Sequence, residues 1–419
     1  IKRLSRFSCI GLWCGNNENN EAWHKWGWQI GLGKDTKERL WSDYQNLFNN
    51  ILPTAVKLYS NNNSYWESSP LYGRGDPRFQ TEGDAHDWGI WHDEMKFESF
   101  EQRVPRFMSE AGFQSLPSLS TILSFCPKDE LNLESKSMLA HQKHPRGNKL
   151  IQEYLQRDLP QPNNFESLIY LNQLNQAEGM GIAINAHRRA KPYCMGTLYW
   201  QFNDCWPGLS WSSRDYFGHW KAFQHKTKEL YQPLLVSTRR SGNIIEIFAS
   251  SDIPKPINAS LNLTINKLSG ELLFKENLNI KLQTNQSKRV YTIDLDKLNF
   301  KLDEHNSAIS IVWIYENHES SLISFFTKLK DLNLIKPNFN IEQIKSIPQG
   351  YEFQLSSDHI CKAVYLEENN DIQFFPNFID MLPNRPINVR CSTKLKNLDL
   401  KQTKIISLFD HLNIKKRNE

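Results

Sequence analysis

Two glutamates, Glu18 and Glu110, each follow a short apolar run that we predict to be a β-strand. Glu18 lies in LWCGNNENNEAW at residues 12–23, and Glu110 lies in PRFMSEAGFQS at residues 105–115. Two carboxyl groups that face each other across a pocket can cleave a glycosidic bond, one protonated to assist the leaving oxygen and the other ionised to attack. These residues therefore suggest glycoside hydrolysis.

The spacing of the two glutamates fits a particular architecture. They are 92 residues apart, and an eight-stranded α/β barrel of about 250 residues has roughly 31 residues per strand–helix unit. A separation of about three units places two strand-end side chains across the barrel mouth from each other. A strand-end glutamate can equally be a solvated or salt-bridged residue, so the spacing alone leaves both interpretations open.

Aromatic and amide residues concentrate in the same half of the chain. Of the 13 tryptophans, 12 precede residue 221. Indole rings can stack on the apolar faces of a pyranose, and the asparagines around Glu18 can hydrogen-bond sugar hydroxyls and orient the acid. Trp28, Trp41 and Trp66 can each be core residues instead.

Strands and helices alternate in this half, with polar and aromatic residues at the strand ends. That pattern is typical of a (β/α)8 barrel, of which we expect only about five strands here. We expect Asn163 and Glu166 to form a capping box at the start of the longest helix. The strands are expected at residues 9–15, 64–70 and 193–204, and the helices at residues 36–60 and 163–190.

The half after residue 240 shows short apolar–polar alternation, which is typical of antiparallel β-sandwiches. Residues 332–340 contain Pro337 and several asparagines and are predicted to be a linker. We therefore predict domains at residues 1–230, 231–333 and 334–419. The strands in this half are expected at residues 243–250, 259–266, 289–295, 308–315, 350–356 and 362–368.

Composition excludes several classes of protein. A net charge of +4 over 419 residues gives no reason to expect nucleic acid, and no apolar run is long enough to span a membrane. Seven cysteines without Cys-x-x-Cys spacing predict neither a disulfide framework nor a zinc site. No base is evident beside Cys14 or Cys205, so a thiol nucleophile is not expected. No metal-ligand spacing is expected from the histidines, which include His86, His141, His144 and His187.

The first residues, IKRLSRF, are basic and amphipathic, and no initiating methionine precedes them. They are typical of the end of a helix rather than of a signal peptide. We expect the chain to lack an N-terminal portion, so any targeting segment would lie outside it.

Several strings occur in order in the first half: GLWCGNNEN, GDAHDWGIWH, PRFMSEAGFQSLPS, HQKHPRGN and INAHRRAKPYCMGTLYWQFNDCWPGLSWSSRDYFGHWKAF. Together they resemble the β-mannosidases of glycoside hydrolase family 2, through residues 1 to about 230. FFPNFIDMLPN at residues 374–384 is similar to the C-terminal Ig-like domain of that family. The resemblance implies a multidomain fold: a partial TIM barrel, strands 4–8, followed by two all-β Ig-like sandwich domains.

The resemblance also implies a retaining exo-β-mannosidase that releases terminal β-D-mannose from manno-oligosaccharides or N-glycan cores. Glu18 would be the acid/base at the end of strand 4, and Glu110 the nucleophile at the end of strand 7. Asn17 would contact the 2-hydroxyl, and Trp200 would form the floor of the −1 subsite. No metal or cofactor is implied. Further residues expected to line the pocket are Trp88, Trp91, His92 and, less directly, Trp26.

Two other residues near the strand-6 string, Asp84 and His86, are expected to support the pocket, and Asp204 to brace a loop. Two alternatives remain open: another family 2 exo-β-glycosidase such as a β-galactosidase, or a non-catalytic carbohydrate-binding remnant. The expected partner is a β-mannoside oligosaccharide. The sequence indicates no oligomeric state, and the resemblance suggests a periplasmic, secreted or lysosomal location.

Overall fold

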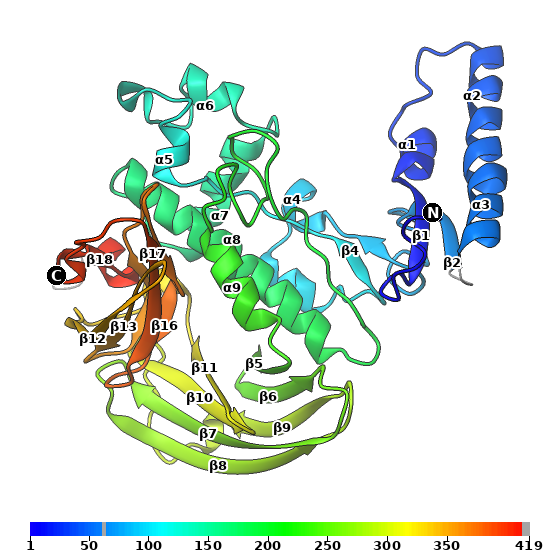
Figure 1. The fold of residues 1–419 in the computed structure, drawn as a ribbon. Helices are drawn as coiled ribbons and strands as arrows, with labels where there is room; N and C mark the ends of the chain where they lie inside the picture. Colours follow the sequence, from blue (N-terminus) through cyan, green and yellow to red (C-terminus); the bar gives the residue numbers. More distant parts are fainter. Residues whose placement is uncertain (61–63, 413–419) are drawn as a thin grey trace. The chain divides into compact units, whose positions relative to one another are not determined.

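The computed structural model describes residues 1–60 and 64–412 and divides into two compact units. The first unit contains residues 1–112 and 186–200, and the second contains residues 113–185 and those from 201 onward (Figure 1). Among the described residues, no helix combines the length and the apolar character that crossing a lipid bilayer requires. All seven cysteines carry free thiols.

The first unit begins with a parallel strand pair, β1 (Leu12–Asn17) and β2 (Ser64–Ser69). The strand predicted at residues 9–15 therefore starts and ends later than expected. The pairing continues to Asn17 opposite Ser69, which keeps the first asparagines inside the ladder. This places Glu18 directly after the last paired residue of β1, where α1 (Asn19–Lys25) begins.

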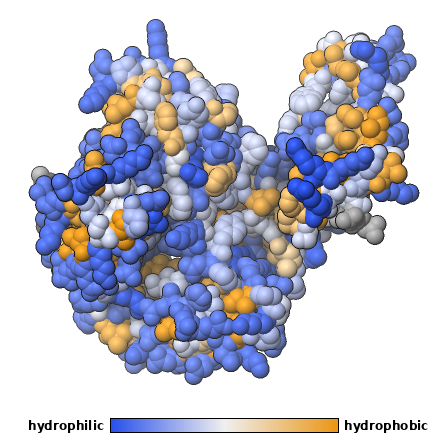
Figure 2. Space-filling model, viewed as in Figure 1, coloured by the Kyte–Doolittle hydropathy of each residue, from blue (hydrophilic) through white to orange (hydrophobic). Residues whose placement is uncertain are grey.

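The helix predicted at residues 36–60 is present in three consecutive segments: α2 (Lys34–Asn46), the π-helical η1 (Leu47–Ile51) and α3 (Leu52–Tyr59). Pro53 has no N–H to donate, and the wider π turn lies just before it. Leu40, Leu47 and Ile51 share a periodic stripe, yet all three are exposed. Figure 2 shows apolar residues on the surface of this segment.

A second parallel pair consists of β3 (Ala85–His86) and β4 (Met108–Glu110). The segment predicted as a strand at residues 193–204 runs beside β4 but forms only an isolated bridge at Thr197. Its N–H groups at Leu198 and Trp200 still donate to the backbone oxygens of Met108 and Ala111. Two short helices lie between β3 and β4 in the chain: α4 (Gly89–His92) and the 3₁₀ turn η2 (Phe97–Glu101).

Helices dominate the first part of the second unit. The longest, α8 (Phe165–Arg189), matches the prediction, but its capping differs. The Oδ1 atom of Asn164 accepts from the Ser167 N–H, and the Asn164 N–H donates to Ser167 Oγ, so this pair replaces the predicted Asn163 and Glu166. The shorter helices are α5 (Leu119–Ile122), η3 (Lys128–Glu130), α6 (Lys136–Ala140), α7 (Gly147–Asp158) and α9 (Ala222–Leu230).

Asp204 in this unit braces a loop, as predicted. Its Oδ2 accepts from the hydroxyls of Ser210 and Ser212, and its Oδ1 accepts from Lys143 Nζ.

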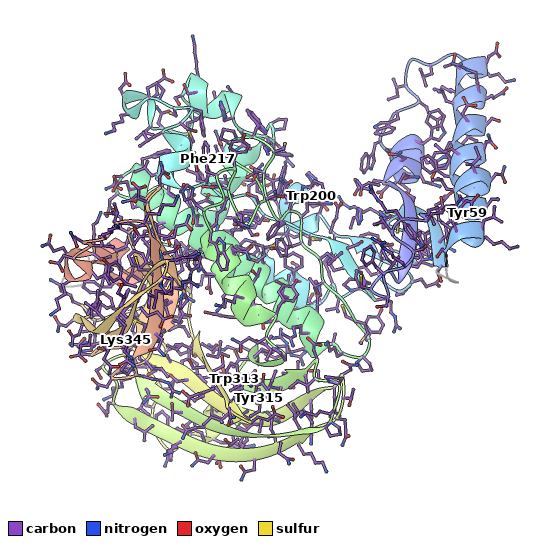
Figure 3. All side chains as sticks on the ribbon, in the orientation of Figure 1. Tyr59, Trp200, Phe217, Trp313, Tyr315 and Lys345 are labelled. Carbon is purple, nitrogen blue, oxygen red and sulfur yellow. The ribbon has the colours of Figure 1, made fainter. Side chains whose placement is uncertain are left out.

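Two antiparallel sheets follow and pack face to face around one hydrophobic core, which contains Trp313 and Tyr315 (Figure 3). The strand order is β5-β6-β9 in one sheet and β11-β10-β7-β8 in the other. Strands appear at all four places predicted here, because apolar residues alternate toward this core. The bounds are β5 (Leu234–Ser241), β6 (Ile244–Ser251), β7 (Ile257–Lys267), β8 (Leu272–Leu282), β9 (Ser287–Asp294), η4 (Leu295–Lys297), β10 (Ser307–Tyr315), β11 (His318–Phe325) and η5 (Leu329–Asp331).

The last described part is a second β-sandwich with its own core, built on Phe353, Leu355 and Phe374. The strand orders are β12-β13-β17-β15 and β16-β14-β18. The predicted linker ends where the first of these strands begins. The bounds are β12 (Phe339–Ile347), β13 (Gly350–Ser357), β14 (Cys361–Leu366), β15 (Ile372–Phe375), β16 (Ile379–Met381), β17 (Ile387–Thr393), η6 (Leu400–Gln402), β18 (Ile405–Ile406) and η7 (Leu408–His411).

An ion cluster centred on a buried lysine joins α8 to this sandwich. Lys362 Nζ lies 2.8 Å from Glu178 Oε1 and 2.8 Å from Asp380 Oδ2, and the lysine is 4% exposed. Lys362→Met removes the buried cation and leaves the partly buried Asp380 carboxylate without it, so we expect the unfolding free energy to fall by about 3 kcal/mol. Urea unfolding followed by circular dichroism measures the change.

The matched control is Lys255→Met, which breaks an exposed pair with Glu316. Solvent already screens that pair, so its unfolding midpoint should hardly move. Equal midpoint shifts for the two variants would contradict the assigned importance of the buried cluster.

Candidate active site

The backbone at Glu18 turns sharply at the end of β1. Its φ of 61° lies in the left-handed region. A residue other than glycine in this backbone conformation costs roughly 1–2 kcal/mol of conformational energy. The Glu18 N–H donates to the Ser69 carbonyl at 2.9 Å, and the Asn19 N–H donates to Asn16 Oδ1 at 3.0 Å. These bonds fix the turn that carries the Glu18 carboxyl group.

Glu110 is the last residue of β4 and stands opposite His86 of β3 in the parallel ladder. The Asp87 N–H donates to the Glu110 carbonyl at 2.9 Å, which fixes this register. Two neighbouring parallel strands therefore present His86 and Glu110 side by side at the same edge.

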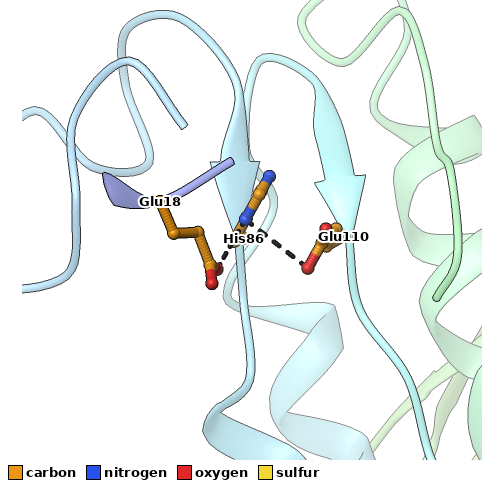
Figure 4. Close-up of side chains that lie close together, drawn as sticks. All are labelled: Glu18, His86 and Glu110. Carbon is orange, nitrogen blue, oxygen red and sulfur yellow. Dashed lines mark hydrogen bonds and ion pairs between the residues drawn. The ribbon is translucent and has the colours of Figure 1, made fainter. Parts of the chain in front are cut away.

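The three side chains of Glu18, His86 and Glu110 converge (Figure 4). His86 Nδ1 lies 2.7 Å from Glu18 Oε1 and 3.5 Å from Glu110 Oε2. One potential ligand atom from each of the three residues lies within 4.8 Å of the others. The His86 side chain is 3% exposed, whereas those of Glu18 and Glu110 are 16% and 13% exposed, so both carboxyl groups reach the surface.

A second set of hydrogen bonds holds His86 at Nε2, the ring nitrogen that does not face the two glutamates. Ser69 Oγ lies 3.0 Å from His86 Nε2 and 2.6 Å from Asp84 Oδ2. Asp84 also accepts from Ser109 Oγ at 2.6 Å and from the Leu71 N–H at 2.8 Å. Asp84 and His86 thus support the site as predicted, but His86 also touches the two glutamates directly.

The pKa of Glu110 is raised to about 7, chiefly because burial disfavours the ionised form. His86 and a hydrogen bond from the Trp88 side chain lower this pKa, whereas the charges of Glu18 and Asp84 raise it further. A raised pKa by itself favours Glu110 as the proton donor, opposite to the nucleophile role predicted from the MSEAG string. The assignment of roles therefore rests on the sequence strings.

The imidazole nitrogen and carboxylate oxygens of these three residues are also atoms that can coordinate a metal ion, although the histidine spacing in the sequence did not indicate such a site. Two ligands about 2.1 Å from one tetrahedral ion lie roughly 3.4 Å apart. The His86 Nδ1–Glu18 Oε1 distance of 2.7 Å is shorter and is that of a hydrogen bond. The arrangement therefore fits a shared proton better than a shared ion.

The asparagines around Glu18 have other partners than those expected. Asn16 donates to the Glu67 carbonyl at 2.8 Å and accepts from Ser68 Oγ at 2.8 Å, and Asn20 donates to Glu67 Oε1 at 2.5 Å. These amides hold the loop together, and the carboxyl group of Glu18 is held by His86. Asn16 acts on Glu18 through the turn, because its Oδ1 accepts from the Asn19 N–H, and not by a direct contact with the Glu18 carboxyl group among the described residues. Asn17 is exposed at the end of β1.

The predicted aromatic residues divide into several environments. Trp88 hydrogen-bonds Glu110 and packs against the exposed His92, with 5.6 Å between ring centroids. Trp91 is fully buried, so its indole has no surface for a sugar, and this candidate is a core residue instead. Trp26 is 49% exposed, and Trp200, labelled in Figure 3, is 42% exposed. Trp200 belongs to the segment that runs beside β4, and its N–H donates to the Ala111 carbonyl.

Sequence reasoning missed the direct contact of His86 with both glutamates. The one available signal was its place in GDAHDW, two residues before Trp88. A two-residue strand has too little alternation to show which way its side chains point.

Comparisons with known proteins agree with this picture. The family model described as a mannosidase Ig/CBM-like domain matches residues 243–331, and the one described as an Ig-fold domain of mannosidases matches residues 334–411. Beta-mannosidase B of Aspergillus clavatus is 26% identical over 411 residues, covering 91% of this chain and 48% of that protein. Beta-mannosidase B of Thermothelomyces thermophilus is 26% identical over 429 residues, covering 94% of this chain and 50% of that protein.

Solved structures give the same result. The crystal structure of beta-D-mannosidase from Dictyoglomus thermophilum matches with a TM-score of 0.85 and 25% identity, covering 97% of this chain and 49% of that chain. An exo-chitosanase from Amycolatopsis orientalis shares the fold, with a TM-score of 0.62, 13% identity and coverage of 85% and 48%. The chain spans about half the length of the curated relatives it matches.

Proposed function

Because the chain is related to the β-mannosidases of glycoside hydrolase family 2 along 91% of its length, we propose that the protein hydrolyses terminal β-D-mannose residues with retention of configuration. The substrates proposed are manno-oligosaccharides and the mannose-containing glycans of glycoproteins. Glu110 is the nucleophile and Glu18 is the acid/base.

One observation carries this proposal: a carboxyl oxygen of Glu18 and a carboxyl oxygen of Glu110 lie within 4.8 Å of each other, with His86 between the two groups. Retaining glycosidases keep their two carboxyl groups about 5–5.5 Å apart, whereas inverting enzymes need about 6.5–9.5 Å to admit a water molecule. Oxygens this close leave little room for a water molecule between the two groups, which supports direct attack by a carboxylate.

The reaction takes two steps. First, Glu110 attacks the anomeric carbon while the proton on Glu18 moves to the departing oxygen, which forms a mannosyl ester and releases the aglycone. Second, a water molecule attacks the anomeric carbon and gives a proton to Glu18 while the bond from that carbon to Glu110 breaks, which restores both carboxyl groups. Trp200 and Trp88 present exposed or half-buried indole surface on which the mannose ring can stack.

We also propose that residues 1–230 represent strands 4–8 of a (β/α)8 barrel. The parallel pairs β1–β2 and β3–β4, and the hydrogen bonds of residues 196–200 to β4, support five parallel strands in chain order. Residues 113–185 belong to the same compact unit as the sandwiches. The proposed boundaries at residues 231–333 and 334–419 lie close to the two family matches.

A panel of 4-nitrophenyl glycosides tests this function on the protein at its native length. We expect 4-nitrophenyl β-D-mannoside to have the highest kcat/KM, and the β-galactoside, β-glucoside and β-glucosaminide to be poor substrates. Proton NMR of the first-formed product should show β-mannose, as retention requires. A higher kcat/KM for another sugar would mean that the proposed substrate is wrong. Inactivity on all four glycosides would favour a non-catalytic carbohydrate-binding protein.

A further inference from the structure

His86 connects the two carboxyl groups to a buried hydrogen-bond network. Asp84 accepts from Ser69 Oγ, Ser109 Oγ and the Leu71 N–H, which is the pattern of an ionised carboxylate that only accepts. Ser69 has a single hydroxyl hydrogen. The shorter contact, 2.6 Å to Asp84 against 3.0 Å to His86, assigns that hydrogen to the carboxylate.

This assignment fixes the proton on the imidazole. With its hydrogen given to Asp84, the Ser69 oxygen can only accept from His86, so His86 Nε2 carries a hydrogen. In neutral His86 the Nδ1 atom is then a bare acceptor, and the 2.7 Å contact requires a proton on Glu18 Oε1. In the imidazolium form the Nδ1–H donates to an ionised Glu18. In both forms one proton lies between the two atoms.

We propose that His86 is a positioning residue of the hydrolysis, one that holds the transferable proton of Glu18 between Nδ1 and Oε1, with its tautomer set by Ser69 and Asp84. This inference rests on the proposed function of Glu18 as the acid/base. In the first step the Glu18 O–H bond breaks as the bond between hydrogen and leaving oxygen forms. In the second step the proton of the attacking water restores the Glu18 O–H bond beside Nδ1.

His86 also faces Glu110 at 3.5 Å, so one imidazole acts on both carboxyl groups. The groups that influence Glu110 are His86 and Asp84 at β3, Glu18 after β1, and the Trp88 side chain. Burial raises the pKa of Glu110 and His86 lowers it. Removing the imidazole should therefore move the acidic limb of the kcat/KM profile to higher pH, because the nucleophile must be ionised.

Two substitutions separate the two ring nitrogens. The amide of His86→Asn lies near the position of Nδ1, and the amide of His86→Gln lies near the position of Nε2. We expect His86→Gln to lower kcat/KM for mannobiose by about 10²-fold, within the range that general acid catalysis contributes. Hydrolysis of 2,4-dinitrophenyl β-mannoside, whose leaving group needs no proton, should fall less than about 5-fold. His86→Asn should retain most of the mannobiose activity.

Controls guard against a merely structural effect. His24→Gln makes the same change at an exposed histidine in the same unit and should leave both substrates unaffected. If His86→Gln unfolds, Ser69→Ala is the substitute, because it cuts the link to Asp84 and should show the same selective loss on mannobiose. Equal losses on the two substrates, or an asparagine variant no better than the glutamine variant, would overturn the proposal.

An NMR readout keeps this inference separate from the choice of substrate. In protein labelled with ¹⁵N-histidine, the His86 resonance is identified by its loss in His86→Asn, and we expect a hydrogen on Nε2 at neutral pH. A neutral His86 with its hydrogen on Nδ1, or a resonance that changes on adding EDTA, would contradict the shared proton. If the panel selects another sugar, the same pair of leaving groups in that sugar series repeats the kinetic test.

Discussion

Replacement of Glu110 by alanine is expected to lower kcat/KM for every mannoside by roughly 10⁴-fold or more, because no ester intermediate can form. Glu110 ends β4 beside His86, and a smaller anion can enter the space left by its carboxyl group. Sodium azide should restore turnover of 2,4-dinitrophenyl β-mannoside and give α-mannosyl azide, since the azide attacks in a single step with inversion.

Glu98→Ala is the control for this variant, since Glu98 is an exposed glutamate in η2 of the same unit. Its kcat/KM should equal that of the unmodified protein. A Glu110→Ala protein that is folded by circular dichroism and retains more than about one hundredth of the activity is incompatible with a nucleophile.

Replacement of Glu18 by alanine is expected to affect substrates according to their leaving groups. The kcat/KM for mannobiose should fall by about 10²–10⁴-fold, because the departing sugar oxygen needs a proton. With 2,4-dinitrophenyl β-mannoside the fall in kcat/KM should be small, while kcat drops because no base activates water in the second step. Azide should then raise kcat and give β-mannosyl azide.

The azide products distinguish the two roles without reference to sequence. The α-azide from the Glu110 variant and the β-azide from the Glu18 variant are predicted, and the reverse pattern would exchange the assignments. That outcome deserves a direct test, because the pKa of Glu110, raised to about 7 by burial, by itself favours the exchanged roles.

Local patterns predicted the strands of the sandwiches well. Along the 11 residues of β7, buried apolar residues alternate with more exposed ones and face one core, so period and burial agree. The positions of Glu18 and Glu110 at strand ends were also predictable, since each follows a short apolar run. The helix at residues 36–60 was expected and is present, although its apolar stripe is exposed in the described residues.

Tertiary contacts decided the features that the sequence did not indicate. Trp91 and Trp88 lie three residues apart, yet the first is fully buried and the second contacts Glu110, which composition cannot distinguish. The bridging position of His86 depends on the register of β3 against β4, and that register is set by partners far along the chain. The asparagines around Glu18 were expected as a group to bind sugar hydroxyls or orient the acid, and one of them, Asn16, is occupied by its own loop.

The most direct test of the account is covalent trapping of the intermediate. The protein at its native length is incubated with 2,4-dinitrophenyl 2-deoxy-2-fluoro-β-mannoside, digested, and sequenced by tandem mass spectrometry. The fluorine slows both steps, and the activated phenol lets the ester form faster than water removes it. We predict one fluoromannosyl group per chain, attached to Glu110. A label on Glu18 or any other residue, or full inactivation without a label, would contradict the assignment of Glu110 as the nucleophile.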